Sequence, residues 1–352
     1  SIALLFAATS TTMISCSSDD DSSDTTIVET QDELVGSIAG ERTLDPSITY
    51  TITGPVIVEE GGVLNIPAGT TIKAKKVLQG GKIYANGTAE NPVRITADID
   101  NAEPGYWGGL IINGRAPLAG GTLGSTEVSS AHQYGGDNPN DNSGRLTYLI
   151  LEYTGARSSA DVEHNGLTLN GVGNGTVIEN IYIPYGADDA IEFFGGTVNV
   201  SNLLVVDSDD DMFDFTQGYS GTLENALDGN FPDQEGQSDF VINNITFDLR
   251  LSPAADADVQ NVTNKMQDVI KIRRGAKATI NNALVKGIGT AIDVVDFTDG
   301  KGAGHTASII NITNTLDDSQ ILGKTINPES GYDNINFQQG NTGCPTSIFA
   351  WT

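Results

Sequence analysis

A near-identical phrase occurs twice in this chain, 22 positions apart, and it constrains the fold more than any other feature. Residues 180–196 read NIYIPYGADDAIEFFGG and residues 202–218 read NLLVVDSDDDMFDFTQG, so that Asp189 aligns with Asp211 without a gap. The alternation of apolar residues in each copy is typical of a strand with one face turned inward. Weaker copies keep the same frame: NGLTL from Asn165, DVIKI from Asp268 and DVVDF from Asp293.

A period near 22 residues is found in leucine-rich repeats and in parallel β-helices. The leucine frame is absent here, and neither half of the repeat has a helical pattern. The repeat therefore predicts an all-β fold, a single-stranded parallel β-helix (solenoid) in which each coil of about 20 to 25 residues holds three short strands. Successive coils stack at the ~4.8 Å spacing of hydrogen-bonded strands, so equivalent side chains lie above one another.

Composition agrees with this fold and bears on the function. The 352 residues include 41 glycines, and Asn and Thr recur beside β-branched residues, which suits short strands joined by tight turns. Lys and Arg total 18 against 46 Asp and Glu, a formal net charge of -28. Because this charge repels nucleic acid and anionic lipid headgroups, we do not expect nucleic-acid binding.

The N-terminal residues predict export and a lipid anchor. The run SIALLFAATSTTMISC is too short for a transmembrane span, and residues 1–15 read as the remnant of a secretion signal. Met13 to Cys16 resemble the bacterial lipobox, whose cysteine is diacylated, and the following SSDDDSSD resembles the acidic export signal of Bacteroidota lipoproteins. We therefore expect an outer-membrane, cell-surface lipoprotein anchored at Cys16, with residues 16–40 as a flexible tether. An ordinary solvated linker is the alternative.

Longer phrases in the rest of the chain carry a family resemblance. They are GGKIYANGTAENPVRITAD, GYWGGLIINGRAP, EHNGLTLNGVGNGT, GADDAIEFFGG and DDDMFDFTQG. Over roughly residues 50–310 the chain resembles a Bacteroidota-type family of bacterial secreted lipoproteins of unknown function. The resemblance implies a right-handed parallel β-helix and implies no particular activity.

We expect one β-helix domain over residues 41–352. Open coil ends expose strand edges, and the candidates to cover them are residues 41–60 at the first coil and Phe349 with Trp351 at the last. Insertions in solenoids project from one side, where binding surfaces usually lie. Three segments break the repeat and are expected to project as loops: residues 115–143, 224–238 and 252–264.

The acids that open each copy are the main candidates for chemistry. If the coils stack in register, the following carboxyl groups converge: Asp188, Asp189, Asp209, Asp210, Asp211 and Asp214. Carboxylates about 5 Å apart repel one another, which raises a pKa or recruits a cation. Three alternatives stay open: the acids cap backbone N–H groups of their turns, they also bind Ca²⁺, which accepts many oxygen ligands, or they are catalytic.

The catalytic alternative comes from a second resemblance. Polygalacturonases are also right-handed β-helices, and they use three clustered aspartates with a histidine and an Arg-Ile-Lys motif. Asp189, Asp210 and Asp211 with Lys271 and Arg273 resemble this set. The resemblance is incomplete, because the basic motif runs in reverse order and the intervening coil lacks the histidine. The ~5 Å between neighbouring coils also matches a retaining rather than an inverting carboxylate pair.

Aromatic and basic residues are candidates for ligand binding. Stacking on sugar rings is open to Tyr106, Trp107 and Tyr134, although the sequence GYWGG is also typical of aromatic residues that fill a coil corner. Arg274 is a candidate to hold an acidic sugar. Alternatively, the basic residues at 271, 273 and 274 form an ion network near Asp268 or Asp293.

The histidines and Cys344 give no further site. His132 and His164 lack neighbours at metal-ligand spacing, so we do not expect zinc. Cys344 has no catalytic motif around it and is expected to be a buried, inert thiol.

The sequence thus predicts a surface lipoprotein that serves as a binding, structural or adhesive module toward glycans or cell-surface partners, stabilised by Ca²⁺. The alternative is a polysaccharide-active enzyme, a polygalacturonase-like hydrolase or a lyase, that uses the ladder of aspartates.

Overall fold

The computed structural model describes residues 31–74, 78–121, 123–157, 162, 164–225, 237–249, 266–287, 291–297, 302–317, 326–327 and 334–352. The predicted signal remnant, Cys16 and most of the predicted tether lie outside the described residues. The predicted loop at residues 252–264 and most of the one at residues 224–238 lie outside them as well.

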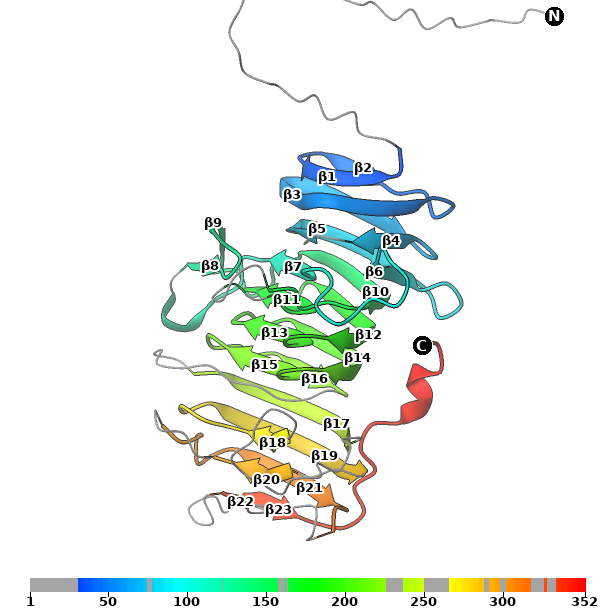
Figure 1. Ribbon diagram of the computed structural model, residues 1–352. Helices are drawn as coiled ribbons and strands as arrows, with labels where there is room; N and C mark the ends of the chain where they lie inside the picture. Colours follow the sequence, from blue (N-terminus) through cyan, green and yellow to red (C-terminus); the bar gives the residue numbers. More distant parts are fainter. Residues whose placement is uncertain are drawn as a thin grey trace, which may run out of the picture.

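The described chain is a stack of coils built from parallel strands (Figure 1). Strand β11 (Leu167–Asn170) pairs with β13 (Ile191–Phe194), and β13 pairs with β15 (Phe213–Thr216). Phe193 is the partner of Phe215, which reproduces the alignment of the sequence repeat. The prediction of an all-β parallel β-helix is confirmed.

Strands that follow one another along the stack form the sides of the solenoid. One side, called face 1, holds β7 (Leu110–Asn113), β11, β13 and β15. Three strands that occupy the corresponding place in later coils form a separate sheet: β18 (Met266–Lys271), β20 (Ala291–Asp296) and β22 (Ile326–Asn327).

Longer strands bend from one side of the solenoid onto the next. They are β3 (Thr49–Pro67), β5 (Leu78–Asn86), β10 (Gly144–Leu151), β12 (Val177–Gly186), β14 (Asn199–Ser208), β17 (Asp239–Leu249), β19 (Lys277–Gly287) and β21 (Ile309–Asn314). The remaining parallel strands are β1 (Glu33–Ile38), β2 (Glu41–Thr43), β4 (Thr71–Ala74), β6 (Val93–Ala97), β16 (Thr222–Glu224) and β23 (Ile335–Phe337).

Asparagines make the bends of the long strands. Asn180 in β12 and Asn202 in β14 have φ of 58° and 57°, a left-handed conformation that asparagine tolerates better than most residues. Their amides stack, since Asn202 Nδ2 donates to Asn180 Oδ1 at 3.0 Å and Asn225 Nδ2 donates to Asn202 Oδ1 at 2.9 Å. The Asn that starts each copy of the repeat therefore holds a corner of the solenoid.

The aromatic position of the repeat forms a stack inside the coils. Ring centroids of Phe193 and Phe215 lie 5.0 Å apart, and those of Phe215 and Phe240 lie 4.3 Å apart. Tyr219 packs against the same rings and donates its hydroxyl to the Val198 carbonyl oxygen at 2.8 Å. Like residues recur in the sequence because each coil presents them to the coil above and below.

The first coil begins earlier than the sequence suggested. Strand β1 starts at Glu33, inside the predicted tether, and pairs with β3. Residues 41–60 do not form a cap. They lie in β2 and β3, and β3 also pairs with β4 and β5 of the next coils. The sequence pattern is looser here, which hid the strands.

The C-terminal segment does not close the last coil, as was expected of Phe349 and Trp351. It runs back along the side of the solenoid to a short 3₁₀ helix, η4 (Thr346–Phe349) (Figure 1). The Asn282 side chain holds the start of this segment, because its Oδ1 accepts a hydrogen bond from the Thr342 N–H at 2.9 Å. Further on, Trp351 packs edge-to-face on Tyr148 of β10, with centroids 5.3 Å apart.

The segment at residues 115–143 carries a projecting hairpin. After the 3₁₀ turn η1 (Ala119–Gly121), strands β8 (Gly124–Thr126) and β9 (Ser129–Tyr134) pair antiparallel and stand out from the stack (Figure 1). Tyr134 anchors the hairpin, since it packs with Leu118 and Phe194 and donates its hydroxyl to Gln217 Oε1 at 3.0 Å. The hairpin is therefore fixed on the outer surface of face 1.

Candidate functional site

Two turns that lead into face 1 bring three aspartates together. Asp188 and Asp189 lie between β12 and β13, and Asp210 lies one coil further, between β14 and β15. Carboxylate oxygens of the three residues lie within 4.8 Å of one another. The parallel register causes this proximity, because the Ala190 N–H donates to the Asp211 carbonyl oxygen and so stacks the two turns.

A second group of three carboxylates lies on face 1 itself. Oxygens of Asp189, Glu192 and Asp214 also lie within 4.8 Å of one another, and the three residues are only 8 %, 6 % and 6 % exposed. Glu192 and Asp214 are direct partners across β13 and β15. Asn165 Nδ2 donates to Glu192 Oε2 at 2.5 Å from the coil above. We call Asp189, Glu192 and Asp214 the buried triad.

The sequence prediction missed Glu192, although the repeat contains a signal for it. The third residue after the opening Asp or Asn of each copy points to the outer surface of its strand, opposite to the core residues on either side. In chain order these residues are Thr168, Glu192, Asp214, Lys271 and Asp296. Of the acids among them, only Asp214 was included in the predicted set, because the repeat was compared by its first acid and its apolar positions.

The structure places the other predicted acids differently. The Asp211 N–H donates to Asp189 Oδ1 at 2.9 Å, so Asp189 caps the turn of the next coil, whereas the capping alternative had placed such bonds within one turn. Asp209 and Asp211 are exposed, and neither belongs to a group of three carboxylates among the described residues. The predicted convergence of six aspartates is therefore incomplete: these two side chains are not part of the groups, although Asp211 is close enough to Asp189 to raise its pKa.

Burial and mutual repulsion raise the pKa values of the buried triad. The pKa of Asp189 is well above its usual value because of burial and then the charges of Asp214 and Asp211. Burial and the nearby charge of Asp214 likewise raise the pKa of Glu192 well above its usual value. Both shifts favour a protonated or cation-bound state of the triad over three free carboxylates. Its oxygen donors fit Ca²⁺, which prefers carboxylate and amide oxygens.

Asp211 titrates close to neutrality. The residue is exposed overall, yet its pKa rises to about 6, because surrounding protein atoms shield the carboxyl group from part of the solvent. Asp210 raises the pKa further, and the positive charge of Arg273 opposes the rise. Asp211 thus combines an exposed position in the turn with a pKa raised to about 6.

A third acidic group lies in the sheet of β18 and β20 and includes a lysine. Oxygens of Asp268, Asp293 and Asp296 lie within 4.8 Å of one another. Lys271 Nζ forms an ion pair with Asp296 and lies 3.4 Å from Asp268 Oδ2. Lys271 is therefore part of an ion network, which was one of the two alternatives for the basic residues. Of the two basic residues in the polygalacturonase-like set, Lys271 is thus engaged with these carboxylates, whereas Arg273 is close enough to Asp211 to lower its pKa.

Two of the predicted aromatic ligands are buried. Trp107 is 0 % exposed and donates its Nε1–H to the Glu152 carbonyl oxygen at 2.7 Å, so it fills a corner of a coil. Tyr134 is 1 % exposed because it anchors the hairpin. Neither ring can stack on a sugar, so ligand binding is wrong for both, and the alternative that Trp107 fills a coil corner is confirmed. Tyr106 is half-buried against the core, and its hydroxyl donates to Asp98.

The remaining residues considered in the sequence are Arg274, His164 and Cys344. Arg274 adopts a left-handed conformation with φ of 55° in the turn after β18, where its N–H donates to the Gly302 carbonyl oxygen at 2.7 Å. His164 is buried in the turn before β11. Cys344 is half-buried, and burial raises the pKa of its thiol to about 11, which agrees with an inert cysteine.

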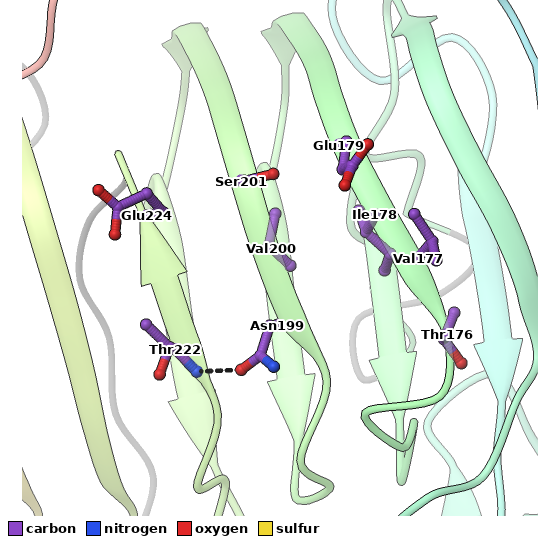
Figure 2. Close-up of a pocket in the computed structure, with 9 residues that line it drawn as sticks. All are labelled: Thr176, Val177, Ile178, Glu179, Asn199, Val200, Ser201, Thr222 and Glu224. Carbon is purple, nitrogen blue, oxygen red and sulfur yellow. Dashed lines mark hydrogen bonds between the residues drawn. The ribbon is translucent and has the colours of Figure 1, made fainter.

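A shallow hollow of about 360 Å³ lies on the outer surface of β12, β14 and β16 (Figure 2). Its lining includes the carboxylates of Glu179 and Glu224, which lie on opposite sides of the hollow, and the Thr222 N–H donates to Asn199 Oδ1 at 2.9 Å inside it. Glu224 also accepts hydrogen bonds from Asn243 and Asn244. This arrangement ties strands together and does not converge on a point where a reaction could occur.

The stacked coils of parallel strands define the chain as a parallel β-helix, and its coils carry groups of neighbouring carboxylates. The chain belongs to the family of pectate-lyase-like β-helix domains, whose model matches residues 36–352. Comparisons with curated proteins and with solved structures gave no match. Among the described residues, no helix has the length and apolar character needed to cross a membrane.

Proposed function

We propose that the protein is a carbohydrate-directed binding module, displayed on the outer membrane through a lipid at Cys16, and not primarily an enzyme. The observation that carries this proposal is the burial of the triad. Carboxylates that are 6–8 % exposed and hydrogen-bonded between coils are poorly accessible to a polymer substrate, whereas they suit a role in holding the coils together. The pectate-lyase-like family supports a carbohydrate as the ligand.

Calcium is the cation that we assign to the buried triad. Asp189, Glu192 and Asp214 would supply its oxygen ligands, and the bound ion would neutralise a repulsion that otherwise weakens the junction of two coils. In this role the ion stabilises the solenoid and does not take part in a reaction.

The test is to incubate the protein with pectin, alginate and neutral plant and host glycans, with and without a chelator. We expect binding without new reducing ends or unsaturated products, together with a chelator-dependent fall in melting temperature. Turnover of any of these polymers would overturn the assignment as a binding module. A Cys16→Ser variant should move from the membrane fraction to the soluble fraction, which tests the anchor separately.

A polysaccharide-active enzyme, a hydrolase or a lyase, is the second candidate. Asp211 favours it, because an exposed carboxyl group with a pKa of about 6 can donate and accept a proton at physiological pH. If turnover is found, Asp211→Asn should abolish it while Asp209→Asn, in the same exposed turn, should not. Activity that survives Asp211→Asn would remove this candidate.

A further inference from the structure

A polar groove of about 430 Å³ lies between the hairpin and the upper coils. One wall is the bend of β3 at Glu59 and Glu60, and the other is strand β9 at His132 and Gln133. Arg115, which follows β7, lies in the groove as well. The buried triad does not line it, so the groove is separate from the acidic site.

The wall formed by the hairpin is held rigidly. Tyr134, directly after Gln133, is buried and hydrogen-bonded to Gln217. The Gly135 N–H donates to the Gly114 carbonyl oxygen at 2.9 Å, and the Asn138 N–H donates to the Arg115 carbonyl oxygen at 3.1 Å. A ligand in the groove would therefore lose little affinity to the ordering of a loop.

The groove combines both signs of charge with uncharged polar groups. Acids from both sides, among them Glu59, Glu60 and Asp141, face the cations Lys82 and Arg115, and Arg115 lies 3.5 Å from Glu60. An apolar ligand would desolvate these groups without replacing their hydrogen bonds. An anionic ligand would be repelled by a molecule of net charge -28. The carboxylate, amide and guanidinium groups of the lining can form hydrogen bonds with neighbouring hydroxyl groups of a ligand, because a hydroxyl group both donates and accepts.

We propose that this groove binds a short stretch of a neutral saccharide chain. Its volume is within the range of small-molecule sites, and its polar lining offers donors and acceptors on both walls. The inference rests on the proposed function as a carbohydrate-directed module and names both the place and the class of the ligand. The insertion that produces the hairpin breaks the repeat, so the groove exists only where the coil departs from its regular form.

The experiment uses affinity electrophoresis of the whole protein in gels that contain laminarin, mannan, arabinoxylan or dextran, with polygalacturonate as the acidic comparison. The groove variants are the double change His132→Ala with Gln133→Ala, and Arg115→Ala alone. The control variants are Glu179→Gln and Ser201→Ala in the hollow of Figure 2. The melting temperature of each variant is measured to check that the variant is folded.

We expect at least one neutral polysaccharide to retard the protein, and each groove variant to weaken that binding by about tenfold or more, as the loss of hydrogen bonds to charged and polar groups implies. The control variants should bind as the wild type does. If a polysaccharide binds and the groove variants bind it equally well, the inference is wrong and the proposed function stands. If only polygalacturonate binds, the neutral class is wrong. If none of the polymers binds, both proposals fall.

Discussion

Single side chains of the buried triad make the stability of the protein depend on pH. For Asp189 and Glu192 the pKa in the folded protein lies above the ordinary values of 3.8 and 4.5, so the fold favours the protonated form. Stability is then greatest at a pH below these ordinary values and is lost as the pH rises through the higher folded pKa. Without divalent cations, the free energy of unfolding should therefore be lower at about pH 7.5 than at about pH 4.5.

The double change Glu192→Gln with Asp214→Asn tests this prediction, because it removes two charges and keeps the side-chain shapes. At about pH 7.5 in chelator the double variant should melt several degrees above the wild type, and at about pH 4.5 the two should be similar. Calcium should raise the melting temperature of the wild type at neutral pH and leave that of the variant unchanged. Asp209→Asn, which is exposed, serves as the matched control. An equal calcium response in all three proteins would contradict the assignment of the ion to the triad.

The corner asparagines contribute to stability in two ways, through their left-handed backbone conformation and through their amide hydrogen bonds, and substitutions of Asn202 separate the two. Asn202→Ala should lower the free energy of unfolding by about 2–3 kcal/mol, because alanine is strained at a φ of 57° and cannot form the two amide hydrogen bonds. Asn202→Gly should cost less, since glycine tolerates this φ and only the hydrogen bonds are lost. Urea unfolding of both variants measures the difference. Equal losses would mean that backbone conformation contributes nothing at this corner.

At the scale of strands and coils, the aromatic stack joins β13, β15 and β17. Phe215 is enclosed between Phe193 and Phe240, so Phe215→Ala should destabilise the protein by about 3–5 kcal/mol. Phe337, in β23 near the end of the stack, is 38 % exposed, and Phe337→Ala should change stability far less. Denaturant unfolding of the two variants provides the comparison. A small effect at Phe215 would show that the coils repack around the gap.

The C-terminal segment is an element whose attachment can be tested apart from the core. Trp351→Ala removes the contact with Tyr148 and should expose residues beyond Cys344 to proteolysis, while the melting temperature of the coils changes little. Limited proteolysis with mass spectrometry measures the loss of the segment. Ser347→Ala, at an exposed position of η4, should be cleaved no faster than the wild type. Equal cleavage of both variants would mean that Trp351 does not hold the segment.

The strands of the regular coils could be predicted from the sequence because the repeat carries two kinds of information. It sets the alternation of side chains within a strand, and it sets the register between strands, as the pairing of Phe193 with Phe215 shows. The path of the C-terminal segment could not be predicted, since Trp351 and Tyr148 are distant in the chain and share no pattern. For Trp107 both ligand binding and corner packing stayed open, because composition alone does not distinguish an exposed ring from one that fills a corner.

The acidic site could be predicted in part. The repeated acids located the right turns, but Asp189 caps the Asp211 N–H of the next coil and not an N–H of its own turn. The sequence did not separate buried from exposed acids, because Asp189 and Asp211 occupy equivalent positions and differ only in what surrounds them. Glu192 was missed because the repeat was compared by its first acid and its apolar positions, and its burial on the outer side of face 1 is visible only in the structure.

For the whole molecule, net charge should govern the response to salt. With 46 acidic and 18 basic side chains, the folded protein carries a strong self-repulsion. Raising NaCl from about 0.01 M to about 0.15 M shortens the screening length from ~30 Å to ~8 Å and should raise the melting temperature. Calorimetry in chelator, with choline chloride as a second salt, measures the effect. A melting temperature that is independent of salt would show that the acids are already neutralised by protons or paired with bases.

The gap-free match between consecutive coils also affects how such a molecule can change in size. A coil that duplicates its neighbour meets the same asparagine, aromatic ring and strand edge above and below, so a tandem copying event in the gene can lengthen the rod by one rung without creating a new kind of junction. Removing one rung is equally simple at the seam, and between Asn180 and Asn202 it would take Glu192 with it. The number of rungs and the number of carboxylates stacked along face 1 therefore change together.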